Sequence, residues 1–280
     1  MKHVTLPALA LTITGLCGPA SAQDVLASPW LDFREARVRL VAAQLDPKIR
    51  PLVAALEIQL ADGFKTYWRT AGDSGVPPMF DFTQSTGMEA IEARYPFPSV
   101  FDDGAGGKAW GYKHAVAFPI AGRRIDGAFM LHLKLDFAVC GTMCIPLSGE
   151  VQFDPAKAER LSGKDADILD RAALTLPTEL AADAAPTPEI TRQQPADPPV
   201  WALRLPYHGA IGEFAAFPEA KGFLEVTGVA ADGPGFAKIT ITGQAAPGSG
   251  GLFGPVRLTY GRPGAAYERM IDLDVARTPP

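Results

Sequence analysis

Two cysteines are the residues of this sequence best suited to chemistry. Cys140 and Cys144 flank the tripeptide Gly-Thr-Met. In a straight strand their Cα atoms would lie about 13 Å apart, whereas a disulfide requires a separation below about 7 Å. Either the chain bends at the tripeptide or the cysteines do not pair. Gly141 favours a bend because glycine adopts backbone conformations that are closed to other residues.

The pair admits three kinds of chemistry. A dithiol can exchange with the disulfides of other proteins through a mixed disulfide. The second possibility is a structural disulfide in a non-catalytic module that binds another envelope protein, although so short a loop gains little stability from chain entropy. Third, two thiolates with Met143 between them form a soft ligand set for Cu(I). The residues alone leave these alternatives open.

The residues before the pair predict how it is presented. Residues 129–137 alternate between apolar odd positions and mostly polar even positions, which is typical of a half-buried strand. The odd positions stay apolar through Val139, so Cys140 falls on the more polar face. We therefore expect Cys140 to be accessible to reaction partners.

The N-terminus predicts export. Residues 1–22 combine a short basic start, an apolar run and the small residues Ala-Ser-Ala before an expected cleavage at Gln23. Removal of this signal peptide also removes Cys17, and Cys140 and Cys144 remain as the cysteines of the mature chain. An oxidising compartment permits disulfides, and we expect this compartment to be a bacterial periplasm.

Charge and motifs argue against several classes of function. The formal net charge of −5 and the pI near 5.4 disfavour a nucleic-acid binder, because phosphate binding needs clustered positive charge. The mature sequence has no apolar run long enough to predict a transmembrane helix. It contains no hydrolytic metal motif, nucleophile elbow or phosphate-binding loop. We expect no cofactor.

The sequence contains 28 glycines and 26 prolines, which interrupt regular secondary structure and therefore predict many short strands rather than long helices. We predict a mainly β protein, with an antiparallel β-sandwich followed by a second, smaller β domain. The predicted parts are a signal peptide over 1–22, a redox sandwich over 23–154, a helical segment with a Pro-rich linker over 155–199, and the second β domain over 200–280. Short helices are expected over residues 156–161 and 165–174.

Three blocks of sequence resemble one known family. Residues 137–146, Phe-Ala-Val-Cys-Gly-Thr-Met-Cys-Ile-Pro, look like the redox strand of the DsbD N-terminal domain family. They are more similar to the periplasmic part of the suppressor-of-copper-sensitivity membrane reductases, which also carry Cys-X3-Cys-Ile-Pro. Residues 62–78 and 108–112 are similar to the same group. The resemblance covers about residues 33–174 and extends only loosely to the second β domain.

The resemblance implies a fold and a site. It implies an immunoglobulin-like domain in which Cys140 and Cys144 form the redox-active pair, with Cys144 as the attacking thiol. It also implies a loop aromatic that shields the pair, for which Phe101 is our candidate. Tyr67 and Tyr112 are candidates for lining the site, although we favour a core position for Tyr67, because adjacent aromatics such as Tyr67 and Trp68 are more often core residues in a β protein.

The resemblance also implies partners. Family members pass electrons through a membrane electron-transporting domain, and these 280 residues contain neither that domain nor a thioredoxin-like one. We therefore expect an inner-membrane electron-transporting thiol reductase and periplasmic disulfide-containing proteins as partners. The protein would then be one component of a protein-disulfide reductase system. In the better-known DsbD proteins the two cysteines lie further apart in the sequence than Cys140 and Cys144 do here. The detailed geometry of their pair therefore does not carry over to this chain.

Overall fold

The computed structural model of this protein describes residues 24–44, 50–104, 106–125, 128–193 and 196–274. The signal peptide predicted over residues 1–22 lies outside this part. Within the described residues, no helix is long and apolar enough to cross a membrane.

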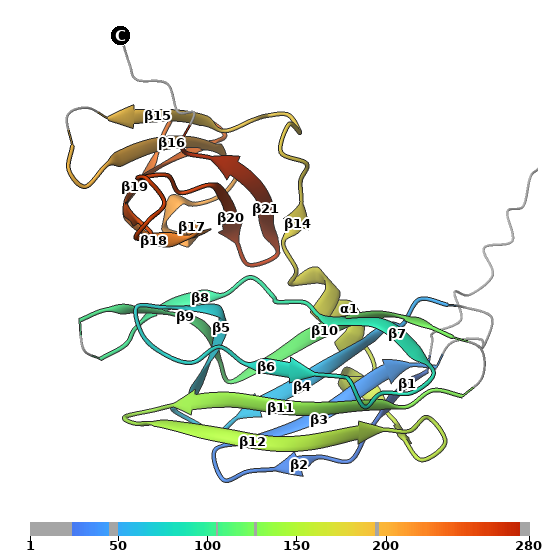
Figure 1. Ribbon diagram of the computed structural model, residues 1–280. Helices are drawn as coiled ribbons and strands as arrows, with labels where there is room; N and C mark the ends of the chain where they lie inside the picture. Colours follow the sequence, from blue (N-terminus) through green and yellow to red (C-terminus); the bar gives the residue numbers. More distant parts are fainter. Residues whose placement is uncertain (1–23, 45–49, 105, 126–127, 194–195, 275–280) are drawn as a thin grey trace, which may run out of the picture.

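Two antiparallel sheets stack face to face in the N-terminal half (Figure 1). The first has the strand order β13-β1-β3-β4-β10-β7, with β2 paired to β3. Its strands are β1 (Val25–Ala27), β2 (Leu31–Asp32), β3 (Ala36–Ala43), β4 (Ala54–Leu60), β7 (Met88–Ala93), β10 (Ala115–Arg124) and β13 (Glu159–Arg160). The second has the order β12-β11-β5-β9-β8, with β6 paired to β11. Its strands are β5 (Lys65–Gly72), β6 (Met79–Asp81), β8 (Ser99–Asp102), β9 (Lys108–Lys113), β11 (Leu131–Cys140) and β12 (Cys144–Phe153). This architecture confirms the predicted mainly β, immunoglobulin-like sandwich.

The main core lies between these two sheets and follows the alternation of the sequence. In β11, Leu131, Leu133 and Leu135 are buried, while Lys134 between them is exposed. These leucines belong to one apolar cluster with Leu40 of the first sheet. Because successive side chains of a strand point to opposite faces, the odd positions of β11 reach this core together.

One helix covers the outer face of the first sheet. Helix α1 (Ile168–Leu174) follows a 3-10 turn over Gly163–Asp165, which agrees with the helix expected over residues 165–174. Its apolar side chains Ile168 and Leu169 pack with Val41 of β3. Strands β3 and β4 are thereby buried on both faces over most of their length.

The second domain is built from two four-stranded sheets (Figure 1). Their strand orders are β14-β21-β20-β17 and β15-β16-β19-β18. The strands are β14 (Thr178–Glu179), β15 (Glu189–Gln193), β16 (Val200–Pro206), β17 (Ala215–Glu219), β18 (Gly222–Ala231), β19 (Phe236–Ala245), β20 (Pro255–Arg262) and β21 (Ala265–Asp272), and a 3-10 turn over Ile211–Glu213 precedes β17. Leu203, Ile239 and Leu258 are fully buried between the sheets.

The segment predicted as a helix and linker over residues 155–199 is divided between the two domains. The helix expected over 156–161 is wrong: a turn is followed by β13, which pairs with β1. The extended linker is also wrong, because β14 joins β21 and β15 joins β16. The prolines lie beside β15 rather than within it. The proline-free stretch Glu189–Gln193 can therefore donate its main-chain hydrogen bonds to a sheet.

An aromatic side chain of the second domain enters the core of the first. Phe217 of β17 is fully buried and belongs to the main core cluster. Its ring centroid lies 5.4 Å from that of Trp68, 5.1 Å from that of Trp110 and 5.3 Å from that of Phe97. The two domains therefore share apolar packing, which favours a fixed relative position.

A buried charge cluster stands beside these rings. The Arg69 guanidinium on β5 donates from Nε to both carboxylate oxygens of Glu219, at 3.1 and 3.0 Å, and from Nη2 to Thr259 Oγ1 at 3.0 Å. It also pairs with Glu268. Burial works against its charge, but the hydrogen bonds that it donates to the two carboxylates, together with their negative charges, outweigh this effect and raise the pKa of Arg69. One arginine of the first domain thus pairs with two acids of the second.

We predict that Arg69→Met destabilises the chain by about 3 kcal/mol, because it leaves the largely buried Glu219 without its counter-charge and leaves Glu268 with only the longer ion pair to Arg257, at 3.8 Å. Urea unfolding at neutral pH measures the loss. The matched control is Arg160→Met, which removes an exposed ion pair with Asp24 and should cost less than about 1 kcal/mol. Equal losses in the two variants would contradict the importance of the cluster.

Candidate functional site

The two cysteines close a tight hairpin. Cys140 ends β11, Cys144 begins β12, and the two are direct cross-strand partners. Their Cα atoms lie 4.0 Å apart and their sulfurs form a disulfide. The amide of Gly141 donates to the carbonyl of Met143 at 3.1 Å within the loop. The chain therefore bends at the tripeptide, which was one of the two possibilities left open by the spacing.

The two cysteines differ in exposure. Cys144 is exposed, whereas Cys140 is buried with 2 % of its surface accessible. The expectation that Cys140 is accessible is therefore wrong. The even face of β11 is polar only in its first half: Lys134 is exposed, but Ala138 and Cys140 are covered.

A second, small core provides this cover. It contains Tyr67, Ala71, Phe101, Ala109, Ala138 and Cys140. Strands β5, β8 and β9 supply its members, and the segment after β5 adds Gly75, which lies against the ring of Tyr67. A Cβ on Gly75 would come within 2.2 Å of that ring, and its φ of +113° favours glycine. The alternation of polar and apolar residues along β11 cannot reveal that side chains from neighbouring strands cover Cys140.

The hydroxyl of Tyr67 reaches the exposed cysteine. Its oxygen lies 3.4 Å from Sγ of Cys144. Burial, and to a lesser degree the charge of Asp103, raise the pKa of Tyr67. The hydroxyl therefore keeps its proton at neutral pH and can donate to a thiolate at Cys144. Tyr67 is both a core residue and a neighbour of the pair.

Two lysines stand in line with the cysteines. Lys113 of β9 pairs with Lys65 of β5, Lys65 pairs with Cys140, and Cys140 pairs with Cys144. Direct cross-strand partners point to the same face of a sheet, so the four side chains form a row. A positive charge beside a thiol favours the thiolate. Sequence reasoning missed these lysines because the strand register brings them to the pair from distant parts of the chain.

Phe101 lies over this row. Its side chain is buried in the same small core as Cys140. The ammonium groups of Lys65 and Lys113 lie 4.7 and 5.6 Å from the centre of its ring. Lys65 also donates to the main-chain carbonyl of Asp102 at 3.1 Å, which ties β8 to β5.

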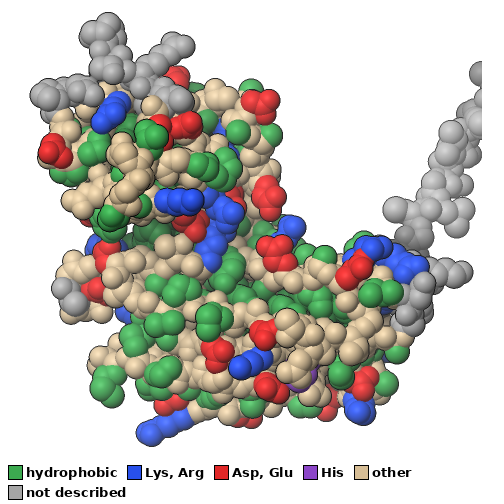
Figure 2. Space-filling model, in the orientation of Figure 1, with side chains coloured by type: hydrophobic (Ala, Val, Ile, Leu, Met, Phe, Trp, Pro, Cys, Tyr) green, Lys and Arg blue, Asp and Glu red, His purple; other side chains and the backbone are tan. Residues whose placement is uncertain are grey.

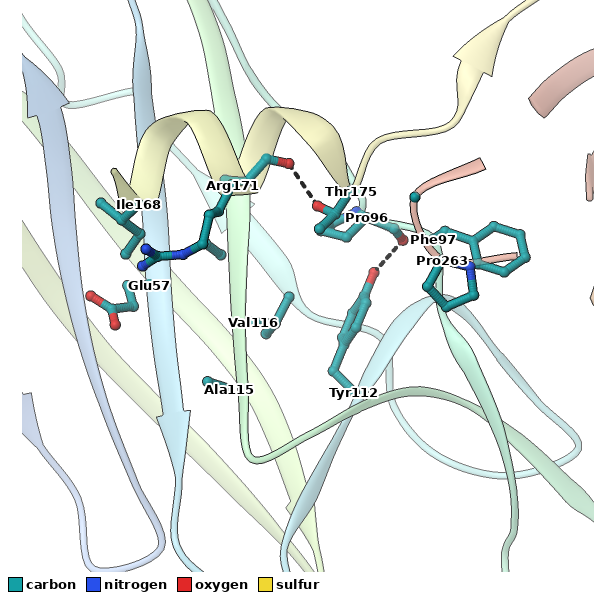
Figure 3. A pocket seen from close by; sticks show the side chains of 13 residues that line it. Glu57, Pro96, Phe97, Tyr112, Ala115, Val116, Ile168, Arg171, Thr175 and Pro263 are labelled. Atoms are coloured by element: carbon teal, nitrogen blue, oxygen red, sulfur yellow. Dashed lines mark hydrogen bonds between the residues drawn. The ribbon is translucent and has the colours of Figure 1, made fainter. Parts of the chain in front are cut away.

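Tyr112 lies elsewhere. It precedes Lys113 on β9 and therefore points to the opposite face of the sheet, into the main core. Its hydroxyl donates to the carbonyl of Pro96 at 2.8 Å, and burial raises its pKa well above the ordinary value. It lines a cavity of about 360 Å³. Figure 3 shows its side chain below α1. The structure does not bring Tyr112 to the cysteine pair.

The side chain considered as a third copper ligand is exposed to solvent. Met143 is the tip of the hairpin loop and 73 % of its surface is exposed. Within the part of the chain that the structure describes, no group of three or more His, Cys, Asp and Glu side chains gathers as a metal site would require. The paired sulfurs offer no thiolate in this oxidised state.

Comparison with known proteins agrees with this geometry. Residues 38–155 match the profile of the family described as thiol:disulfide interchange protein DsbD, N-terminal. No curated protein matches the chain in sequence. The fold is similar to the crystal structure of the N-terminal periplasmic domain of ScsB from Proteus mirabilis, with a TM-score of 0.68 at 20 % identity, over 88 % of this chain and 98 % of that one. A match to the Neisseria meningitidis DsbD N-terminal domain has a TM-score of only 0.28 at 11 % identity, over 52 % of this chain and 96 % of that one.

Residues 38–155 thus match the model of the DsbD N-terminal family, and the fold of the chain is similar to that of the ScsB domain. The resemblance stated from the cysteine block is thereby confirmed. The ScsB similarity extends over both β domains of this chain, since it covers 88 % of the chain.

We predict that the two reduced thiols react at different rates and that Phe101 causes part of the difference. With Cys144→Ser reporting Cys140 and Cys140→Ser reporting Cys144, iodoacetamide should alkylate Cys144 at least about tenfold faster. Adding Phe101→Ala should accelerate alkylation of Cys140 and leave that of Cys144 nearly unchanged, because the ring packs in the cluster around Cys140.

The control for this comparison is Phe33→Ala, which removes a half-buried ring that packs on Phe137 away from the small core. Acceleration by both variants would indicate general loosening of the fold and would remove the shielding role of Phe101.

We also predict that Lys65→Met raises the pKa of the Cys140 thiol by about one unit, because it removes the positive charge opposite that residue. Thiolate absorbance followed against pH in the Cys144→Ser background measures this value. Lys65→Arg should restore it. Lys134→Met, on the same strand but nearer its start, is the matched control; an equal shift there would show that only net charge matters.

Proposed function

We propose that this member of the DsbD N-terminal family exchanges electrons with other proteins through Cys140 and Cys144. The observation that carries the proposal is the unequal exposure of the two sulfurs. Cys144 is exposed at the end of the hairpin, and Cys140 is buried beside it. Exchange needs one sulfur that a partner can reach and a second that resolves the mixed disulfide. A purely structural disulfide needs neither.

In the reducing direction the Cys144 thiolate attacks one sulfur of a partner's disulfide. The partner's S–S bond breaks, a bond forms to Sγ of Cys144, and the other partner sulfur leaves as a thiolate. The Cys140 thiolate then attacks Sγ of Cys144 and releases the remaining partner sulfur. The partner gains two electrons and takes two protons from water, and the protein is left with the disulfide of the present structure.

Reduction of the protein runs through the same atoms in the reverse order. A thiolate of the reductant attacks Sγ of Cys144, and Cys140 leaves as a thiolate. The charge of Lys65, the cross-strand partner of Cys140, favours this departure. Tyr67, 3.4 Å from Sγ of Cys144, donates a hydrogen bond whenever that sulfur carries the negative charge.

The partners follow from the chemistry. A dithiol reductant completes the reduction alone, because its second thiolate attacks its own sulfur in the mixed disulfide and releases Cys144 as a thiolate. We propose a membrane thiol reductase in this role. The oxidised partners are periplasmic proteins with disulfides that an exposed Cys144 can approach. This assignment places the mature chain in the periplasm, in agreement with the signal peptide predicted over residues 1–22.

The copper alternative has less support from the described residues. Only Met143 is added to the two cysteines as a soft donor, and its side chain stands 73 % exposed at the loop tip. Titration of the reduced protein with Cu(I) tests it: tight stoichiometric binding that is lost in Met143→Ala would favour a metal-binding role.

We predict that Cys140→Ser traps a mixed disulfide through Cys144, whereas Cys144→Ser traps none, because only Cys144 is reachable by a partner. Non-reducing electrophoresis and mass spectrometry after incubation with an oxidised, disulfide-containing protein measure the adduct. A stronger adduct in Cys144→Ser would reverse the roles of the two sulfurs. The absence of an adduct in both variants would overturn the exchange function.

A further inference from the structure

The hydrogen bond between Tyr67 and Cys144 depends on where the tyrosine ring is held. The hydroxyl oxygen lies 3.4 Å from Sγ of Cys144. It stands at the far end of a ring that swings with the side-chain torsions, and a hydrogen bond weakens steeply when its geometry is poor. Tyr67 is buried, so the residues packed around the ring decide whether the hydroxyl stays at this position.

The segment between β5 and β6 supplies one of these residues. Gly75 lies so close to the ring that a Cβ there would come within 2.2 Å of Cε1 of Tyr67. Among the residues that the structure describes, no hydrogen bond involves residues 74–77. At the far end of the segment, the hydroxyl of Tyr95 donates to the carbonyl of Pro78 at 3.1 Å. The position of Gly75 therefore depends on packing and on the hydrogen bonds at the two ends of the segment.

Asp73 makes the hydrogen bonds at the near end. Its amide donates to the carbonyl of Lys108 at 2.8 Å, and its carboxylate oxygen Oδ2 accepts from the amide of Lys108 at 2.7 Å. This reciprocal pair fastens the segment to the first residue of β9. The next residue, Ala109, is fully buried in the cluster with Tyr67 and Cys140. Asp73 thus joins the segment that carries Gly75 to a wall of that cluster.

The second domain does not cover this connection. Figure 2 shows a hollow between the two domains, and Asp73 and Lys108 are among the residues that line it. Asp73 is exposed. The ammonium group of Lys108 pairs with Asp102, so the carboxylate of Asp73 serves as the acceptor of a main-chain N–H rather than as the partner of a charge. An uncharged acceptor of the same shape could do the same.

We propose that Asp73 is a positioning residue for the exchange reaction: by fastening its segment to Lys108 it holds Gly75 against the ring of Tyr67, and so keeps the tyrosine hydroxyl beside Sγ of Cys144. The proposal rests on the exchange function proposed above, in which Cys144 becomes a thiolate. Asp73 acts through Tyr67 rather than on the sulfur itself. Loss of the fastening should disfavour the thiolate, because a hydrogen bond to the charged form stabilises it.

The test measures the pKa of the Cys144 thiol from thiolate absorbance against pH, in the full mature chain with Cys140→Ser. Asp73→Ala should raise this pKa by about half a unit, because the hydrogen bond to the thiolate is weakened. Removal of a nearby negative charge alone would lower the pKa, so a rise has another cause than the charge of Asp73. Asp73→Asn keeps an acceptor oxygen for the amide of Lys108 and should leave the pKa at or below the wild-type value.

Two further comparisons show whether Asp73 acts through the tyrosine. In a Tyr67→Phe background, Asp73→Ala should cause no rise, since the hydroxyl is already absent. Gly75→Ala tests the same link without a change at Asp73. It presses a methyl group on the ring and should raise the pKa when the tyrosine hydroxyl is present and not when it is absent.

The matched control is Asp81→Ala. It removes another exposed aspartate whose carboxylate accepts from a main-chain amide, that of Thr83 at 2.8 Å, and it should not raise the pKa. The proposal is overturned by the absence of a rise in Asp73→Ala, by an equal rise in Asp73→Asn or in Asp81→Ala, or by a rise that persists in the Tyr67→Phe background.

These measurements use the protein alone and need no redox partner. Exchange is followed separately, as the rate at which the reduced chain with both cysteines reacts with a small aromatic disulfide. If that chain fails to react, the exchange function is overturned, while the pKa values still decide the role of Asp73. If it reacts, Asp73→Ala should move the pH at which the rate rises upward by the same amount as the pKa.

Discussion

The register of β5 with its two neighbours is the constraint on which the site depends. By pairing Lys65 with Cys140 on one side and with Lys113 on the other, it aligns two positive charges with the cysteines. A slip of one residue would send Lys65 and Tyr67 to the opposite face. The burial of Trp68 in the main core prevents such a slip, since its large ring would then leave that core. Packing therefore fixes the electrostatics of the pair.

Several features that depend on local pattern could be predicted from the sequence, although the helix expected over residues 156–161 is not among them. The strand leading to Cys140 shows its own alternation, the cysteine block carries the family resemblance, and the helix near residue 170 follows from its residues. The features that the sequence did not predict depend on contacts with strands from distant parts of the chain. To predict the burial of Cys140, one would have to know that side chains of β5, β8 and β9 pack against the even face of β11. The position of Tyr112 on the opposite face of the sheet was missed for the same reason, because the register of β9 with β5 determines it.

The second domain illustrates a different limit of sequence reasoning. Prolines dominate the segment before it and favoured a linker, yet two short strands fit between them. Short strands bury little surface alone, and they form because completed sheets offer them an edge. The domain is held to the first by Phe217 and by Arg69 with its two acids. Neither contact has a local signature, because its partners lie about 150 residues apart.

These connections converge on one short region of the molecule. Trp68 and Arg69 on β5 bind the second domain, and Lys65 and Tyr67 on the same strand contact the surroundings of the cysteines. Strand β5 fixes the position of the cysteine site relative to the second domain, since the aromatic contacts around Trp68 and the charge cluster are both buried. The hairpin, by contrast, ends in an exposed loop that has to open by only one S–S bond. The two domains thus keep a fixed relative position, and the disulfide is the bond of the hairpin that has to break. This arrangement suits the proposed exchange with different partners at one sulfur.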